Sequence, residues 1–331
     1  MDEINLLADK IKQGDRAALS RGITLTESDL PLHKSQAMSL LDQLYPATGK
    51  SIRIGISGIP GVGKSTLIES LGTYLIDQHQ KRVAVLAIDP SSEQSSGSVL
   101  GDKTRMESLS RREEAFIRPS PTKAQLGGVA QQTQTAILLC EAAAYDIIIV
   151  ETVGVGQSEI AVNHMVDVFL LLQIVGAGDD IQAMKRGVLE WVDMVVFNKA
   201  DKGKETQANA EAANMSKALA LFPPKHPGWT IPVLSCSALE KTGIEAIWEN
   251  IVSHQQHLTQ QQLFHKQRED QLINFLRSLE EQVLHLFFAQ HKKVNQLREN
   301  NMQNWQTKAA PPFGILQGFK KQLEKLLPIE E

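Results

Sequence analysis

The stretch Gly58-Ile59-Pro60-Gly61-Val62-Gly63-Lys64-Ser65-Thr66 decides the fold of this 331-residue chain. It has the spacing G-x-x-x-x-G-K-[ST], in which glycine-rich backbone turns its N–H groups towards phosphate oxygens and the following helix adds its positive end. In such a loop the lysine, here Lys64, reaches the β- and γ-phosphates, and the hydroxyl of Ser65 holds Mg²⁺. The predicted phosphate-binding residues are Gly58, Gly61, Val62, Gly63, Lys64, Ser65 and Thr66.

The residues on both sides of this loop have the pattern that a phosphate-binding loop requires. Residues 53–57 form a short apolar run that predicts a buried strand, and residues 65–77 have apolar side chains at helical spacing. Strand, loop and helix in this order distinguish such a loop from a glycine-rich turn without chemistry. Further strands are predicted at residues 82–88, 146–150, 168–173, 193–197 and 231–235. Together these elements predict an α/β fold with a mainly parallel sheet and helices on both faces.

Two acidic residues, Asp89 and Glu151, stand directly after predicted strands. The carboxyl ends of parallel strands are where such sheets bind their ligands. Both residues are therefore candidate Mg²⁺ ligands, directly or through water, and Asp89 is also a candidate for positioning a water molecule. Asp102, in the Ser- and Gly-rich segment 91–105, is a third candidate. The plain alternatives are a helix cap at Asp89 and a solvated loop acid at Asp102.

The string that begins at Glu151 continues as Thr152-Val153-Gly154. An acid, two spacers and a glycine after a strand match the second half of a nucleotide switch. The backbone N–H of Gly154 can bond a γ-phosphate and be released when that phosphate is lost. Gly154 is therefore a predicted nucleotide-binding residue.

Asn198-Lys199-Ala200-Asp201 follows another predicted strand and is the N-K-x-D pattern that reads guanine. The Asp201 carboxylate can accept hydrogen bonds from guanine N1–H and the 2-amino group, a donor pair that adenine lacks. Lys199 would lie along the base, and Asn198 would brace the neighbouring loops. After the last strand, Ser237-Ala238-Leu239 stands where a backbone N–H contacts guanine O6.

Composition excludes several classes of protein. A formal net charge of −4 argues against a general affinity for nucleic acid or acidic membranes. No apolar run has membrane-spanning length, and the N-terminus lacks the layout of a signal peptide, so we expect a cytoplasmic protein. Cys140 and Cys236 are too few for a disulfide framework. His254, His257 and His265 lack a convincing ligand spacing, so we expect solvated histidines.

Three segments are predicted along the chain. Residues 1–45 form an N-terminal helical extension that packs on the nucleotide domain or on a partner. Residues 46–254 form the P-loop domain, and residues 255–331 form a helical arm. In this arm, apolar side chains at helical spacing run from Leu272 to Phe287.

Taken together, these motifs resemble the MeaB/ArgK family of P-loop GTPases, which act as chaperones of adenosylcobalamin-dependent methylmalonyl-CoA mutase. The most specific strings are Asp89-Pro90-Ser91-Ser92 and the string from Glu151 to Gln157. The resemblance covers essentially the whole chain and implies Mg²⁺-dependent hydrolysis of GTP to GDP. Lys64, Asp89 and Glu151 are then the catalytic residues, and the helical arm forms a homodimer.

The same resemblance implies that residues 89–105 and 154–157 are nucleotide switches. It also implies a third switch, Gly178-Asp179-Asp180 with Lys185, facing the mutase. Two other functions remain open: a protein kinase of a transport system, and a metallochaperone GTPase for nickel. The guanine motif argues against the kinase, and the lack of a convincing His or Cys cluster argues against the metallochaperone.

The guanine motif makes a direct prediction about nucleotide choice. Asp201→Asn should weaken GTP binding by about 1–3 kcal/mol, because one member of the hydrogen-bond pair becomes a donor facing a donor. The same change should improve the binding of xanthosine triphosphate, which presents an acceptor there. Nucleotide titrations of both proteins test this, and equal affinity of the wild type for ATP and GTP would refute the assignment.

Overall fold

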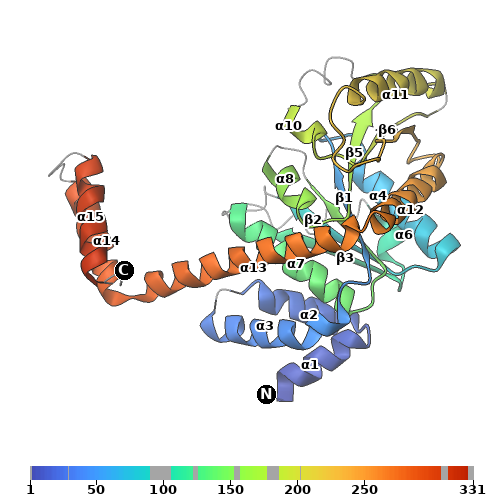
Figure 1. Ribbon diagram of the computed structural model, residues 1–331. Helices are drawn as coiled ribbons and strands as arrows, with labels where there is room; N and C mark the ends of the chain where they lie inside the picture. The colour runs from blue at the N-terminus through green and yellow to red at the C-terminus, as the bar shows by residue number, and fades with distance from the viewer. Residues whose placement is uncertain are drawn as a thin grey trace. The chain divides into compact units, whose positions relative to one another are not determined.

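A computed structural model describes residues 2–28, 30–89, 106–121, 126–152, 157–176, 186–201, 203–306 and 312–326. Within these residues, a seven-stranded sheet has the order β3-β2-β4-β1-β5-β6-β7, and neighbouring strands are parallel (Figure 1). The predicted fold class is therefore confirmed. The strands are β1 (Ile52–Ser57), β2 (Val83–Asp89), β3 (Ala115–Pro121), β4 (Ile147–Glu151), β5 (Val168–Ile174), β6 (Met194–Asn198) and β7 (Val233–Ser235).

Helices cover both faces of this sheet. One face packs against α4 (Lys64–His79), α6 (Glu107–Ser110) and α12 (Ile244–Gln260). The other packs against α7 (Leu126–Ala142), α8 (Gln157–Asn163), α11 (Glu205–Leu219) and the N-terminal helices. The remaining helices are α1 (Asp2–Lys12), α2 (Arg16–Thr26), α3 (Pro31–Leu44), the 3-10 turn η1 (Tyr45–Ala47), α10 (Arg186–Leu189), α13 (Leu263–Gln290), α14 (Lys292–Gln306) and α15 (Pro312–Leu326). No helix of the described ranges is long and apolar enough to cross a membrane.

The central strands are mostly apolar because both faces of the sheet are covered. In β4, Ile147 and Ile149 are buried with α4 and α12, whereas Ile148 and Val150 are buried with α7. Successive side chains of a strand point to opposite faces, so a strand between two helical layers needs apolar residues on both of its faces. This is why continuous apolar runs predict these strands correctly.

The edge strand β3 is not among the predicted strands. Only Ala115, Phe116 and Ile117 are apolar and consecutive, and Pro119 and Pro121 follow them within the strand. Proline cannot donate a hydrogen bond to a neighbouring strand, so it argues against a central strand. Among the described strands, β3 pairs with β2 alone and lies at the edge of the sheet, where proline is tolerated.

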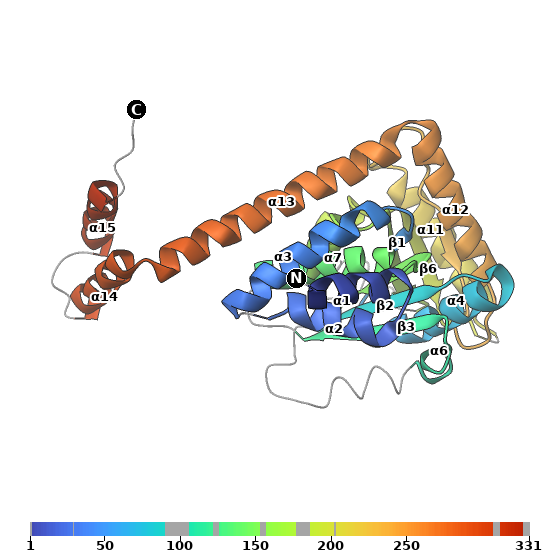
Figure 2. The same ribbon diagram turned by 90° about the horizontal axis from the view of Figure 1, so that it is seen from below.

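The N-terminal helices pack on the nucleotide domain. Figure 2 shows α1, α2 and α3 side by side next to α7, and Leu7, Leu19, Leu40 and Leu139 belong to one buried cluster. The approach is close at Gly22 of α2, where a Cβ atom would lie 2.9 Å from the Ile11 side chain. Of the two roles that the sequence leaves open for this segment, packing on its own domain is the one observed.

Contacts divide the chain into two compact units, Met1–Gln271 and Leu272–Glu331. The predicted boundary after residue 254 falls inside α12, and the first unit includes the start of α13. The expectation of a solvated His254 is wrong: its side chain is completely buried. His254 lies on the face of α12 that also buries Ile247 and Ile251, a helical spacing that a single histidine does not reveal.

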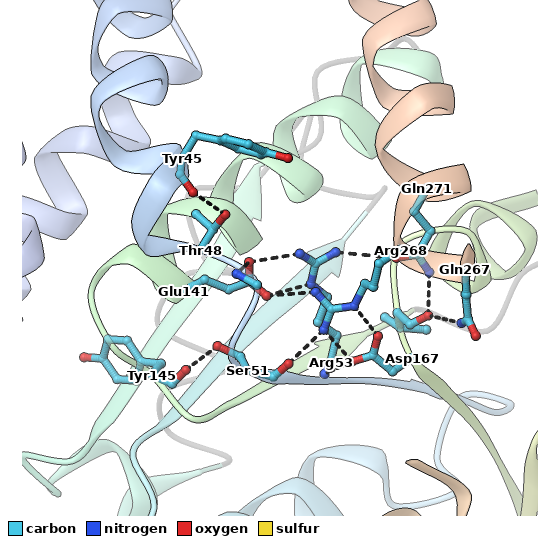
Figure 3. Close-up of polar contacts among 12 residues, drawn as sticks. Tyr45, Thr48, Ser51, Arg53, Glu141, Tyr145, Asp167, Gln267, Arg268 and Gln271 are labelled. Atoms are coloured by element: carbon cyan, nitrogen blue, oxygen red, sulfur yellow. Dashed lines mark hydrogen bonds and ion pairs between the residues drawn. The ribbon is translucent and has the colours of Figure 1, made fainter. Parts of the chain in front are cut away.

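A buried ion network crosses the amino ends of β1 and β5 (Figure 3). Arg53 of β1 donates to both carboxylate oxygens of Glu141 at 2.9 Å. Arg268 of α13 also donates to Glu141, at 3.1 Å, and forms a two-pronged ion pair with Asp167. Burial acts to raise the pKa of Glu141, but the guanidinium groups of Arg53 and Arg268 outweigh it and hold this pKa below its ordinary value. The network therefore connects β1, α7 and α13 within the first unit.

Replacing Glu141 should destabilise the protein in a pH-dependent way. Glu141→Gln removes the negative charge that pairs with the buried guanidinium groups of Arg53 and Arg268. This loss should lower the unfolding free energy by about 3–5 kcal/mol at neutral pH. Because the folded-state pKa is depressed, the contribution of Glu141 is complete above its unfolded pKa of about 4.3 and is lost as pH falls through the folded pKa. Urea unfolding at several pH values should therefore show that the difference in unfolding free energy between the wild type and Glu141→Gln becomes smaller as the pH falls.

Glu107→Gln is the matched control, because Glu107 pairs with Arg111 on an exposed surface. Exposed pairs contribute about 0–1 kcal/mol, so this variant should resemble the wild type at every pH. Equal effects of the two substitutions would mean that the buried network does not stabilise the fold.

Candidate functional site

The phosphate-binding loop joins β1 to α4, so the predicted order of strand, loop and helix is confirmed. Its backbone is left-handed at Gly61 (φ +80°) and Gly63 (φ +99°), a region that glycine enters without strain. Helix α4 begins at Lys64, directly after the loop. The N-terminal N–H groups of α4 and its dipole therefore face the carboxyl edge of the sheet, where an anion is stabilised.

Glycine is also required here because the loop packs closely on its neighbours. A Cβ atom at Gly63 would lie 2.5 Å from Nδ2 of Asn198, and one at Gly58 would lie 2.7 Å from the carbonyl oxygen of Leu172. Real Cβ atoms essentially never come this close to other heavy atoms. The loop thus rests directly on β5 and β6.

The polar side chains of the loop make contacts within the site. The buried Lys64 donates from Nζ to the carbonyl oxygens of Gly58 at 2.7 Å and of Ile59 at 3.3 Å. The Ser65 hydroxyl donates to Oε1 of Glu151, at the end of β4, at 3.2 Å. A lysine and a hydroxyl–carboxylate pair, all predicted from the motifs, therefore lie at one end of α4.

Asn198 connects two loops of the site. Its Nδ2 donates to the carbonyl oxygen of Val62 at 2.9 Å, and its Oδ1 accepts from the backbone N–H of Ala238 at 3.1 Å. Val62 belongs to the phosphate-binding loop, and Ala238 belongs to the loop after β7. This is the bracing that the N-K-x-D motif led us to expect of Asn198.

Asp201 is held by a residue from the same β7 loop. The Ser237 hydroxyl donates to Oδ1 of Asp201, and the backbone N–H of Glu240 donates to the Ser237 hydroxyl at 3.0 Å. Lys199 has a left-handed backbone (φ +63°), which turns the chain sharply between Asn198 and Asp201. The sequence does not reveal this role of the Ser237 side chain, since a serine after a strand carries no signal for a carboxylate 36 residues away.

The other predicted site residues differ in how far the structure places them. Asp89 is the last residue of β2, and in the pairing of β2 with β4, Ala87 is level with Glu151. Asp89 therefore stands at the same edge of the sheet as Glu151, two residues further along a neighbouring strand. Leu239 belongs to the loop after β7 and its side chain is exposed. Asp102, Gly154, Asp180 and Lys185 lie outside the described residues.

Loops with phosphate-binding and guanine-reading sequences meet at one edge of a parallel sheet, which is the arrangement of a P-loop GTPase. Comparison with known families gives a more particular answer. Residues 19–292 match the family described as "Methylmalonyl Co-A mutase-associated GTPase MeaB". The chain belongs to this family, and it is a GTP hydrolase of the P-loop class.

Individual relatives agree with this assignment. The chain is 46% identical over 281 residues to "GTPase ArgK" of Escherichia coli, an alignment that covers 85% of each protein. It is 51% identical over 257 residues to a "Putative GTPase" of Caulobacter vibrioides, covering 78% of each. A solved structure titled "Crystal structure of LAO/AO transport system kinase" superposes with a TM-score of 0.74 at 35% identity, covering 98% of both chains.

A comparison of two glycine variants separates the effect of close packing at Gly63 from the effect of its backbone conformation. Gly61→Ala and Gly63→Ala both place alanine at positive φ, but a Cβ at Gly61 would have no atom of the described residues within 4 Å. Gly63→Ala should therefore lower the unfolding free energy by about 1–3 kcal/mol more than Gly61→Ala does, because it displaces Asn198. Urea unfolding without nucleotide measures this difference. Equal destabilisation would show that the Gly63–Asn198 contact does not constrain the site.

Proposed function

We propose that this GTPase is a nucleotide-switched chaperone of adenosylcobalamin-dependent methylmalonyl-CoA mutase, which gates the loading and protection of the cobalamin cofactor. The observation that carries the proposal is membership, over residues 19–292, of a family described as mutase-associated. The site supports a switch, because its nucleotide loops extend from a rigid sheet edge. In this proposal GTP and GDP are the two ligands, and the mutase is the client.

GTP would bind with its phosphates over the loop from Gly58 to Thr66. In this structure the Lys64 ammonium group contacts the carbonyl oxygens of Gly58 and Ile59. When GTP binds, Lys64 would exchange these two contacts for contacts with phosphate oxygens. The guanine would lie beside Asp201, whose carboxylate is already oriented by Ser237. A preoriented acceptor loses little side-chain entropy when it binds the base, which favours selectivity for guanine.

The residues at the start of α4 fit a magnesium ion. The Ser65 hydroxyl and the Glu151 carboxylate approach to 3.2 Å, and oxygen atoms of these two types are the ligands that Mg²⁺ prefers. Asp89, at the neighbouring strand end, and Asp102 are the further proposed ligands. Bound Mg²⁺ would neutralise charge that develops on the phosphates during transfer.

Hydrolysis in such a site depends on positioning and electrostatics. Water attacks the γ-phosphorus in line with the leaving GDP oxygen, and the products are GDP and inorganic phosphate. We assign Asp89 to orient this water or accept its proton, and Lys64 to stabilise the charge of the phosphates. Glu151 would hold the Mg²⁺ ion. Gly154 would bond the γ-phosphate through its N–H and release it after hydrolysis.

The partner would sense the nucleotide through the segment containing Gly178, Asp179, Asp180 and Lys185. A mutase that binds the GTP form and the GDP form with different affinity must change the relative affinity for the two nucleotides by the same factor. The proposed chaperone cycle therefore requires that complex formation depends on the nucleotide. We also expect the mutase to accelerate hydrolysis.

GTP turnover with and without purified mutase tests this function. The wild type should hydrolyse GTP faster in the complex, whereas Asp180→Ala and Lys185→Ala should keep their intrinsic turnover and lose the stimulation. Lys64→Ala should be inactive under both conditions, which controls for contaminating GTPases, and EDTA should stop turnover if Mg²⁺ is needed. Absence of both binding and stimulation in every nucleotide state would refute the mutase as client.

The proposed assembly is a homodimer formed through the C-terminal arm. Leu276, Val283 and Phe287 of α13 are about half exposed or more, and their spacing places them on one helical face. A second copy of the chain would cover this face, since large apolar patches are rarely left in water. Light scattering of the full chain at micromolar concentration should give twice the mass of one chain, and a monomer would contradict the proposal.

A further inference from the structure

Three side chains converge at the amino end of β6, far from the nucleotide loops. Asp193 lies directly before β6, His226 lies between α11 and β7, and His254 lies on α12. Oδ1 of Asp193 is 3.3 Å from Nε2 of His226 and 3.5 Å from Nε2 of His254. The potential ligand atoms of all three residues lie within 4.8 Å of one another. Asp193 and His254 are completely buried, and the His226 side chain is 13% exposed.

The facing atoms of this cluster lack hydrogen bonds. Oδ1 of Asp193, Nε2 of His226 and both ring nitrogens of His254 have no hydrogen-bond partner within the described part of the chain. Buried polar atoms are nearly always paired with protein, water or an ion. The three unpaired atoms that approach one another, Oδ1 of Asp193 and Nε2 of each imidazole, therefore call for a bound species.

The second oxygen of Asp193 has a different environment. Oδ2 accepts from the backbone N–H of Phe169 at 2.9 Å and from Nζ of Lys225 at 2.8 Å. Lys225 also donates to Asn163 at 2.8 Å and to the Trp191 carbonyl at 3.2 Å. Burial acts to raise the pKa of Asp193, but Lys225 and the imidazoles outweigh it and hold this pKa far below its ordinary value. The carboxylate is therefore held in place by these hydrogen bonds, and its Oδ1 is directed at the two imidazoles.

The imidazole of His254 is also held in place by its neighbours. The Trp229 indole donates to the carbonyl oxygen of Asp193 at 3.0 Å, and its ring meets His254 edge to face at 4.8 Å. The His226 and His254 rings are 5.4 Å apart. Side chains supported in this way keep their positions when a ligand arrives, as good metal sites require.

We propose that Asp193, His226 and His254 form a Zn²⁺ site. Two imidazoles and a carboxylate form a donor set typical of zinc, which takes four ligands in a tetrahedron at about 2.0–2.2 Å. In that geometry neighbouring ligand atoms are about 3.3 Å apart, close to the two separations from Oδ1. Water would complete the tetrahedron.

This zinc site is separate from the GTPase site. Asp193 precedes the first residue of β6, and Asn198 ends the strand, so the two sites lie at opposite edges of the sheet. A strand of this length separates them by about 16 Å at about 3.3 Å per residue. Zinc here would therefore cross-link β6, α12 and the segment before β7, and its binding free energy would stabilise the folded unit.

Zinc titration of the full chain, stripped with chelator and then desalted, tests the proposal. Calorimetry at about pH 7.5 should show one Zn²⁺ per chain, with MgCl₂ in excess to saturate the nucleotide edge. Thermal unfolding should shift upward with ZnCl₂. Co²⁺ in place of Zn²⁺ should give the intense visible absorption of a tetrahedral complex.

Variants locate the binding. His254→Gln and His226→Gln should each weaken Zn²⁺ binding by ten-fold or more and abolish the thermal shift. His226 is partly exposed, so its variant remains informative if His254→Gln folds poorly. The matched control is His257→Gln: His257 is one turn away on α12, and its Nε2 already contacts the Pro227 carbonyl oxygen at 2.9 Å. This control should bind Zn²⁺ as the wild type does.

Lys225→Gln should change the Zn²⁺ affinity in the opposite direction. Lys225 neutralises the carboxylate through Oδ2, so removing its charge should tighten Zn²⁺ binding several-fold while lowering the stability of the metal-free protein. Failure of the wild type to bind Zn²⁺ would overturn the proposal, as would equal binding by all histidine variants. A stability that depends on pH but not on Zn²⁺ would also overturn it, because the cluster would then hold a proton.

Discussion

The geometry of the nucleotide edge depends on the side-chain amide of Asn198. One end of this amide donates to the phosphate-binding loop at Val62, and the other accepts from the β7 loop at Ala238. An amide carries donor and acceptor in a fixed plane, so it sets the separation of the two loops as well as joining them. Gly63 must lack a side chain because the same amide lies against it. The phosphate end and the base end of the site are thus held in one arrangement.

Parallel pairing of the strands is what brings these residues together. All carboxyl ends of a parallel sheet open on one edge, so the loops after β1, β6 and β7 and the end of β4 at Glu151 become neighbours although they are far apart in the sequence. The opposite edge is held by charges: Glu141 between two arginines, and Asp193 beside Lys225. Removing one member of such a buried pair is costly, because the remaining charge stays in an apolar environment. The amino edge therefore acts as a rigid base for the loops that bind nucleotide.

This division of the sheet also separates the two inferences about function. GTP hydrolysis rests on family membership and on loop residues at the carboxyl edge, whereas the zinc site rests on unpaired atoms at the amino edge. The proposed recognition of a client concerns the segment with Asp180 and Lys185, and neither inference depends on the other. Both edges belong to one compact unit, so metal at one edge would act on the other only through the stability of the sheet.

Contiguous motifs determined the fold class and most of the candidate site. The phosphate-binding loop and the Asn198–Asp201 string are recognisable because each packs its chemistry into a few successive residues, whose conformation the local backbone sets. Apolar runs likewise revealed the central strands, but not the proline-containing edge strand β3. Tertiary structure alone decided the contacts between distant residues: Ser237 with Asp201, Glu141 with Arg268, and Asp193 with His226 and His254. Such pairs produce no recognisable spacing in the sequence. The crossover connections of the sheet, and not the local sequence, bring their side chains together.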